Sequence, residues 1–413
     1  MMIVSISDVP FFDTRKNLTT LVLPILFLFF LVIFVPTNAI GSGGLVCLLV
    51  WVLWSETELR NRWWKAIWPW LLVVLIYFVS MSFYAFSRVT ALRDCTEVLK
   101  GIALSVVAAH VLQFSDHQLR RSMEYVVLLL LTATLAIVVF NLNNLGFTNL
   151  IGHGFDWYVR LQNQGFDWYV NRNRLAVGFS IVSIFIAALM VEEKARFKSF
   201  LLSAAWMFMA AAAVLNASRG AVVGMILATV CIFIAGLLRA GWRQVFRIEI
   251  WALPIVFAVV AIAWICHSHF SVSLVLLHHN SVSDNRTIIW HTVWERALQS
   301  PWFGFGPHAM KYDPMVPSQI LAADHPHDIY LGLFYASGFF GVLFWLIWFS
   351  SFSYKIRQSF TAKNKVSYYV GIGFLVNILI HGLVDFDFYM FSIFTYITVG
   401  LVLLLPKFAY KEC

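Results

Sequence analysis

The chain has 413 residues, of which 61% are hydrophobic, 17% are aromatic and only 12% are charged. A soluble globular domain carries about 25% charged residues, so a water-soluble fold of this chain would expose much apolar surface. The composition therefore excludes a soluble enzyme and predicts an integral membrane protein. The net charge of +8 is attributed to cytoplasmic anchors rather than to nucleic-acid binding, because basic residues gather in the inner loops of membrane proteins.

Apolar runs of spanning length recur along the chain. A spanning helix needs about 20 mostly apolar residues, and the first run is too long for the core of a cleavable signal peptide. We predict an all-α, polytopic membrane protein with about 12 transmembrane helices. The candidate spans are residues 18–37, 40–54, 66–84, 98–114, 122–141, 174–191, 199–216, 219–238, 250–267, 329–352, 367–384 and 387–405.

The basic residues set the orientation of these spans. If the N-terminus is cytoplasmic, every predicted cytoplasmic loop is basic, including the turn with Lys194, Arg196 and Lys198. The positive-inside rule then places both termini in the cytoplasm. Most basic residues left on the outer side are arginines, Arg88 and Arg93 among them. Arginine suits phosphate recognition, so we interpret this bias as a hint of an anionic ligand, with chance and lipid headgroup contacts as the alternative.

The predicted spans divide the chain into three parts. Residues 1–266 hold helices 1–9 and an outer aromatic loop at 141–173, residues 267–328 form a large outer loop, and residues 329–413 hold helices 10–12 and a cytoplasmic tail. The aromatic loop repeats the motif Gly-Phe-Asp-Trp-Tyr-Val at 154–159 and 165–170. Trp and Tyr at this density are typical of the membrane interface, and sugar stacking is the functional alternative.

The large outer loop carries most of the polar chemistry. A helix is expected from Thr287 to Leu298, with Asp284 as its N-cap. This arrangement would put Arg286 in the first turn, where the helix N-terminus also favours an anion. Pro301 ends the helix, and a glycine turn with Gly304 and Gly306 follows.

Two further residues stand out at the outer ends of predicted spans. Pro326 marks a helix boundary, so His327 is expected at the membrane–water interface. Arg219 begins a span directly after the preceding one ends, where an ionisable side chain is a functional candidate. The structural alternatives are a histidine bonded to a backbone carbonyl and a snorkelling arginine.

Three sequence blocks occur in a recognisable order. They are Ser218-Arg219-Gly220, then Asn285-Arg286 followed by Pro301, Gly304 and Gly306, then His327-Asp328-Ile329-Tyr330-Leu331 followed by Gly338 and Gly341. This pattern resembles the O-antigen ligase and polymerase superfamily of membrane glycosyltransferases, best over residues 170–385. Two features depart from it: Asp328, where the family usually has asparagine, and the repeat at 154–170.

The resemblance implies a GT-C-like fold in the bacterial inner membrane, with a periplasmic active site. It implies transfer of a glycan from undecaprenyl diphosphate to an acceptor hydroxyl, which in ligases belongs to the lipid A-core. Arg219 and Arg286 match the diphosphate-binding arginines of the family, and His327 matches its essential histidine. The chemistry needs no metal or other cofactor, because two arginines can stabilise the leaving diphosphate. A histidine, with an unperturbed pKa of about 6.5, suits the role of base, and His325 is a candidate partner.

Other interpretations remain open at this point. Asp385 and Asp387 form a D-x-D motif that could hold a divalent cation against a diphosphate, or pair with an outer arginine. An O-antigen polymerase or a protein O-oligosaccharyltransferase would use the same donor, and the short C-terminal tail disfavours the latter. A transporter of lipid-linked glycan predicts charged groups within the spans, whereas here the charges cluster at helix ends.

Overall fold

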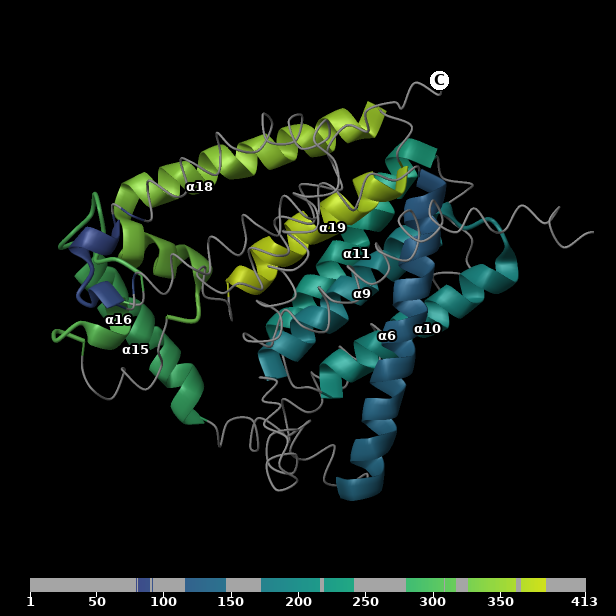
Figure 1. The fold of residues 1–413 in the computed structure, drawn as a ribbon, viewed down its shortest axis with the longest axis horizontal. Coiled ribbons are helices and arrows are strands. Elements are labelled where there is room, and N and C mark those ends of the chain that lie inside the picture. Colours follow the sequence, from purple (N-terminus) through teal and green to yellow (C-terminus); the bar gives the residue numbers. More distant parts are fainter. Residues whose placement is uncertain are drawn as a thin grey trace, which may run out of the picture.

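A computed structural model describes residues 79, 81–89, 91, 116–145, 172–215, 219–240, 280–307, 309–316, 326–361 and 365–383. Every regular element among these residues is a helix (Figure 1). The labelled helices are α6 (Asp116–Leu145), α9 (Arg172–Glu192), α10 (Arg196–Leu215), α11 (Arg219–Ala240), α15 (Asn280–Ala297), α16 (Ala309–Tyr312), α18 (Ile329–Thr361) and α19 (Lys365–Gly382). The all-α prediction is confirmed for this part of the chain.

Six predicted spans correspond to α6, α9, α10, α11, α18 and α19. The bounds of α9, α10, α11 and α19 agree with the prediction to within a few residues, whereas α6 and α18 extend beyond it. Of the remaining predicted spans, only the end of 66–84 falls among the described residues. The predicted aromatic loop 141–173 begins and ends in described helix, since α6 extends to Leu145 and α9 begins at Arg172, whereas its repeat and the D-x-D motif lie outside the described residues. The predicted total of 12 spans therefore stays a prediction.

Helices α9, α11 and α19 lie side by side and form the centre of the bundle (Figure 1). Phe185 of α9 and Phe374 of α19 are fully buried, and their ring centroids lie 5.8 Å apart. Gly373 lets α19 approach its neighbours, because a Cβ there would lie 2.6 Å from Ile184 of α9 and 2.8 Å from Ile232 of α11. The bundle is thus held by close apolar packing.

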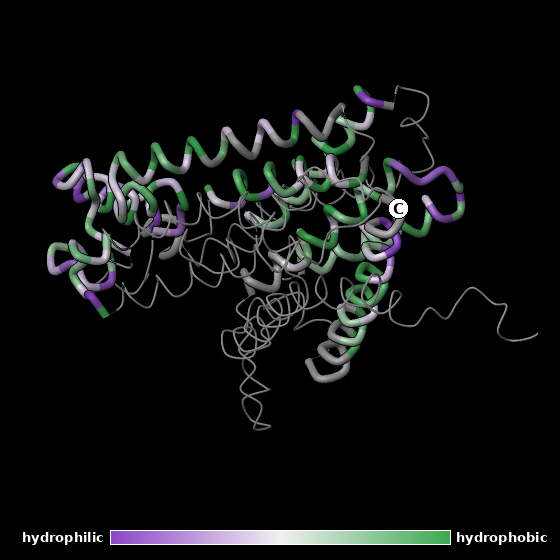
Figure 2. The backbone as a smooth tube through the Cα atoms, turned by 45° about the horizontal axis from the view of Figure 1, so that its top comes forward, coloured by the Kyte–Doolittle hydropathy of each residue, from purple (hydrophilic) through white to green (hydrophobic). Residues whose placement is uncertain are grey.

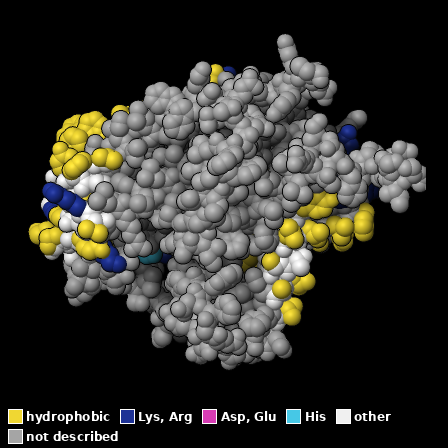
Figure 3. Space-filling model, viewed as in Figure 1, with side chains coloured by type: hydrophobic (Ala, Val, Ile, Leu, Met, Phe, Trp, Pro, Cys, Tyr) yellow, Lys and Arg dark blue, Asp and Glu magenta, His cyan; other side chains and the backbone are white. Residues whose placement is uncertain are grey.

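Two described helices are long and apolar enough to cross a membrane, Gly220–Arg239 and Ile329–Ile347. Gly178–Glu192 and Val366–Gly382 are apolar but shorter. Figure 2 shows hydrophobic residues along most of α18 and hydrophilic ones in the turn between α9 and α10. Hydrophobic side chains are exposed over α6 and α10, and again over α15, the loop at residues 302–303 and α16 (Figure 3). A lipid environment would cover such surfaces.

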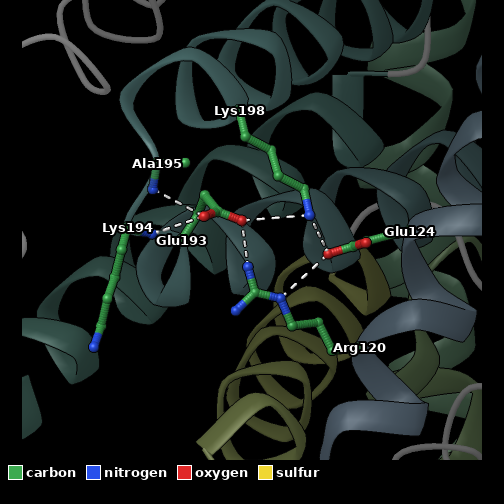
Figure 4. Close-up of polar contacts among 6 residues, drawn as sticks. All are labelled: Arg120, Glu124, Glu193, Lys194, Ala195 and Lys198. Atoms are coloured by element: carbon green, nitrogen blue, oxygen red, sulfur yellow. Dashed lines mark hydrogen bonds and ion pairs between the residues drawn. The ribbon is translucent and has the colours of Figure 1, made fainter.

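A charged cluster joins the start of α6 to the turn between α9 and α10 (Figure 4). Arg120 pairs with Glu193 and with Glu124, and Lys198 lies 2.7 Å from Glu124. Burial alone would raise the pKa of Glu193, but the N–H groups of Ala195 and Lys194 and the charge of Arg120 hold it below its usual value. The start of α6 and the turn between α9 and α10 therefore lie at the same end of the bundle, as the predicted topology requires for two cytoplasmic loops.

Helix α18 is broken at Gly338, which has a φ of 60° and a ψ of −159°. In an unbroken helix, the N–H groups of Phe339 and Phe340 would donate to the carbonyls of Tyr335 and Ala336. Here these groups bond to the loop at residues 301–306 instead. Phe339 and Phe340 donate to Pro301 and Trp302, and the two freed carbonyls accept from Phe305 and Gly306. The predicted span 329–352 is thus two helical arms that meet at Gly338, where the loop at residues 301–306 crosses the helix.

Candidate functional site

The peptide segment before α18 holds His327 in an unusual backbone conformation. His327 has a φ of 54°, and it is the one non-glycine residue with a positive φ in the part of the chain that the structure describes. Asp328 fixes the following turn, because its Oδ1 accepts hydrogen bonds from the N–H groups of Tyr330 at 2.8 Å and Leu331 at 2.9 Å. This is an N-cap, and it sets where α18 begins.

Burial raises the pKa of Asp328 above its usual value, although those two N–H groups oppose the shift. An amide side chain in the same place would accept the same hydrogen bonds without carrying a charge. The aspartate is therefore compatible with the cap geometry that an asparagine would provide at this position.

Helix α15 brings Arg286 towards the same segment. The indole N–H of Trp290 donates to the carbonyl of Pro326 at 2.8 Å, and Pro326 directly precedes His327. Arg286 is half-buried and lies one helical turn before Trp290, hence on the same face of α15. The contact between α15 and the segment before α18 therefore brings the helical turn that carries Arg286 towards the peptide segment that carries His327.

An apolar core fixes α15 against the first arm of α18. Ile289, Val293 and Ala297 are buried against Phe334 and Tyr335. Trp294 stacks at a tilt on Phe334, with ring centroids 5.5 Å apart. This core lies one to three turns along α15 from Arg286, so the position of that arginine is set by packed helices rather than by a loop.

The structure corrects the predicted start of this helix. α15 begins at Asn280, so Asp284 lies inside the helix and is not its N-cap. The prediction failed because no proline or glycine separates Asn280 from Arg286, so the helix continues back to an earlier residue that also suits a cap. Arg286 thus lies in the second turn, and its affinity for an anion would come from its own charge rather than from the helix end.

Arg219 is the first residue of α11, and its position is given by that helix. Gly224 of α11 packs on Asn377 of α19, which places the start of α11 beside the last turns of α19. Those turns in turn contact α18, since the hydroxyl of Tyr330 donates to the carbonyl of Leu379 at 2.9 Å. The starts of α11 and α18 therefore both lie at the end of the bundle formed by the last turns of α19.

A buried ion pair secures the loop after α15. Arg296 Nε and the hydroxyl of Tyr335 each donate to Asp313 Oδ2 at 2.7 Å. The Met315 N–H donates to Oδ1 at 2.9 Å, and Arg296 also lies over the ring of Phe305 at 4.4 Å. Burial alone would raise the pKa of Asp313, but these hydrogen bonds and the charge of Arg296 hold it below its usual value.

Comparison with known families identifies the segment that holds these features. Residues 202–346 match the model of the O-antigen ligase family. We refer to this matched segment as the O-antigen ligase domain. Members of this family are embedded in membranes, and the family implies enzymes that transfer lipid-linked glycans. No curated protein sequence matches the chain.

The O-antigen ligase domain contains Arg219, Arg286 and His327, the three residues for which the sequence predicts a role. Of the other candidate residues, the structure describes only Arg88. Arg88 is exposed, on a short segment that touches the domain where Tyr84 stacks on Phe303, with ring centroids 5.8 Å apart. Arg93, His325 and Asp385 lie outside the described residues, so their roles stay predictions.

Two features of the O-antigen ligase domain escaped the sequence analysis. One is the Arg296–Asp313–Tyr335 cluster, whose members are distant in the sequence and match no motif. The other is the break at Gly338. Its signal was present in the glycines of the loop and of the helix, but their pairing across about 30 residues follows no local rule.

Proposed function

We propose that the protein is an O-antigen ligase. It transfers a polysaccharide from undecaprenyl diphosphate to a sugar hydroxyl of the lipid A-core, at the periplasmic face of the bacterial inner membrane. The observation that carries the proposal is the match of residues 202–346 to the O-antigen ligase family, together with the Trp290–Pro326 hydrogen bond between the helix of Arg286 and the segment that holds His327. Both lipid-linked substrates reach such a site from within the bilayer.

The proposed reaction is one displacement at the anomeric carbon of the donor. The acceptor oxygen forms the new bond to that carbon, while the bond to the diphosphate oxygen breaks and its electron pair leaves with the diphosphate. Arg219 and Arg286 stabilise the charge that develops on the leaving group, without a metal ion. Attack from the face opposite the diphosphate inverts the anomeric centre.

In this scheme His327 accepts the proton of the attacking hydroxyl, a role worth about 10²–10⁴-fold in rate. Its left-handed backbone supports the assignment, because strained residues persist where the surrounding structure holds them and they cluster at active sites. The Asp328 cap on one side and the Trp290 bond to Pro326 on the other restrict this segment. A base held in this way can meet a hydroxyl in one orientation.

The proposal is tested with purified protein, undecaprenyl-diphosphate glycan and lipid A-core, in the presence of EDTA. A His327→Asn variant is the sharpest partner, because asparagine tolerates the left-handed backbone but is not a base. His291→Ala is the matched control, since His291 lies in the same loop with 72% of its side chain exposed. We expect ligated product from the wild type and the control, and a fall of at least about 100-fold for His327→Asn.

The other outcomes are equally informative. Lengthening of the glycan on its own lipid carrier would identify a polymerase. Loss of transfer in EDTA would contradict the metal-free mechanism and direct attention to Asp385 and Asp387. Absence of any transfer, with substrates that a control enzyme accepts, would overturn the assignment as a glycosyltransferase and favour a transporter.

A further inference from the structure

Helix α19 carries two polar side chains in its otherwise apolar last two turns. Asn377 and His381 are four residues apart, so they share one face of the helix, and both have no exposed surface. Polar groups inside a membrane bundle are costly and commonly serve a function. Neither residue belongs to the segment that matches the O-antigen ligase family, which ends at residue 346.

Asn377 fits into a gap on α11 that exists because residue 224 is glycine. A Cβ at Gly224 would lie 2.5 Å from Oδ1 of Asn377, but 3.4 Å from its backbone oxygen. The Asn377 side chain therefore fills the space above Gly224, and this fit helps to fix the position of α11 along the axis of α19. A residue larger than glycine at 224 would force the buried Asn377 side chain into another rotamer or shift one helix along the other, unless that side chain were shortened.

The amide of Asn377 does not strengthen the bundle. Neither Oδ1 nor Nδ2 has a hydrogen-bond partner within the residues that the structure describes. A buried amide without partners is destabilising, because its hydrogen bonds to water are lost and not replaced. Residues that lower the stability of a protein occur most often at its functional sites.

The position of the Asn377 side chain links the two halves of the candidate site. Arg219 lies five residues before Gly224, at the start of the same helix. On α19, two residues beyond Asn377, the carbonyl of Leu379 accepts the hydroxyl of Tyr330, and Gly382 packs on Ile329 with a Cβ position 2.6 Å from its Cγ2. Contacts with α19 therefore position the starts of both α11 and α18.

We propose that Asn377 is a positioning residue, which acts through Gly224 to hold Arg219 at the correct height relative to His327. The inference rests on the proposed function, because it concerns the same transfer reaction. It predicts that the fit between residues 224 and 377 controls binding and turnover of the lipid-linked donor. The chemistry of the amide is secondary to the space that it fills.

A double-mutant cycle separates this role from a general structural one. Gly224→Ala is expected to raise the donor KM, or lower kcat/KM, by at least about tenfold, because the new methyl displaces α11. Asn377→Ala is expected to reduce activity while leaving the melting temperature unchanged or raised, since it removes the unsatisfied amide. The Gly224→Ala/Asn377→Ala variant is expected to recover to within about threefold of wild type, because the added methyl occupies the vacated space.

Gly373→Ala is the matched packing control, because it crowds Ile184 and Ile232 further along α19. We expect it to lower the melting temperature without changing the donor KM of the folded protein. Three results would overturn the inference: a fully active Asn377→Ala, a folded but inactive double variant, or a donor KM in Gly373→Ala that rises as it does in Gly224→Ala. Wild-type ligation in the same assay shows that such a failure concerns Asn377 and not the proposed function.

Discussion

Gly304 and Gly338 lie where the loop crosses α18, and each passes too close to the backbone of the opposite segment to carry a side chain. A Cβ on Gly304 would lie 2.4 Å from the carbonyl carbon of Ala336, and a Cβ on Gly338 would lie 2.4 Å from that of Trp302. Both glycines have a positive φ, of 66° and 60°. Since the opposing atoms are backbone atoms, no rotamer change can relieve either contact.

Replacing Gly338 with alanine should therefore destabilise the protein strongly. The backbone at Gly338, with a φ of 60° and a ψ of −159°, lies in a region that is essentially limited to glycine and costs another residue about 1–3 kcal/mol, and the steric clash adds to this. Thermal unfolding of the detergent-purified Gly338→Ala variant measures the effect. Gly332→Ala is the control on the same helix, because its nearest contact is Pro326 Cγ at 3.2 Å and its φ is not positive. Equal melting temperatures for the two variants would contradict the claim that the loop and α18 cross too closely at Gly338 for any side chain.

The buried carboxylate of Asp313 should contribute more to stability than a surface charge does. Asp313→Asn leaves Arg296 without its partner, and breaking a buried pair in this way costs about 3–5 kcal/mol. Glu295→Gln is the matched control, because the side chain of Glu295 is 66% exposed and lies beside the exposed His291 of the same helix. That change should cost less than about 1 kcal/mol. A loss of similar size in both variants would contradict the prediction.

The same carboxylate predicts an effect of acid. Its pKa is lower in the folded protein than in the unfolded chain, so its contribution is complete above the unfolded value of about 4. The contribution is lost as the pH falls through the folded pKa. Unfolding measured against pH should show that wild type loses stability in this acidic range faster than Asp313→Asn does.

Asp328 should behave in the opposite way. Its pKa is raised by burial, so its contribution to stability is complete below the unfolded pKa and is lost as the pH rises through the folded value. Asp328→Asn keeps the N-cap and removes the charge, so it should be as stable as wild type or more stable at neutral pH. Asp328→Ala should lose about 1 kcal/mol, the usual cost of a missing cap. An asparagine variant as unstable as the alanine variant would show that the charge itself is needed.

The charged cluster at the α9–α10 turn leads to a test of topology. In a cysteine-free background, Arg121→Cys and Lys194→Cys should stay unlabelled by a membrane-impermeant maleimide applied to intact spheroplasts. Lys311→Cys, in the loop after α15, should be labelled. All three side chains are exposed, so differences in labelling report the side of the membrane. Labelling of Lys194→Cys from outside would reverse the predicted orientation.

The sequence predicted the helices whose signal is local. α9, α10, α11 and α19 were placed to within a few residues, because long apolar runs with basic ends define a span almost alone. The start of α15 was wrong, since Asn280 and Asp284 are both suitable caps and only tertiary context selects between them.

The candidate site also has a part that the sequence predicts and a part that it does not. Arg219, Arg286 and His327 were selected by residue type and by position at helix ends, and their roles stay predictions. What links their helices is the Trp290–Pro326 bond and the contacts of α19, and these join residues that are 36 or more positions apart. Such contacts follow from packing, which no local pattern encodes.

The crossing at Gly338 also limits how this protein can be recombined with its relatives. Residues 301–306 complete the hydrogen bonding of α18, so the loop and the helix behave as one piece of architecture although a long stretch of chain separates them. A chimaera that exchanges the loop alone would pair foreign peptide groups with the native helix. Swaps intended to change acceptor or glycan preference should therefore take the loop and residues 335–340 together, as a single module.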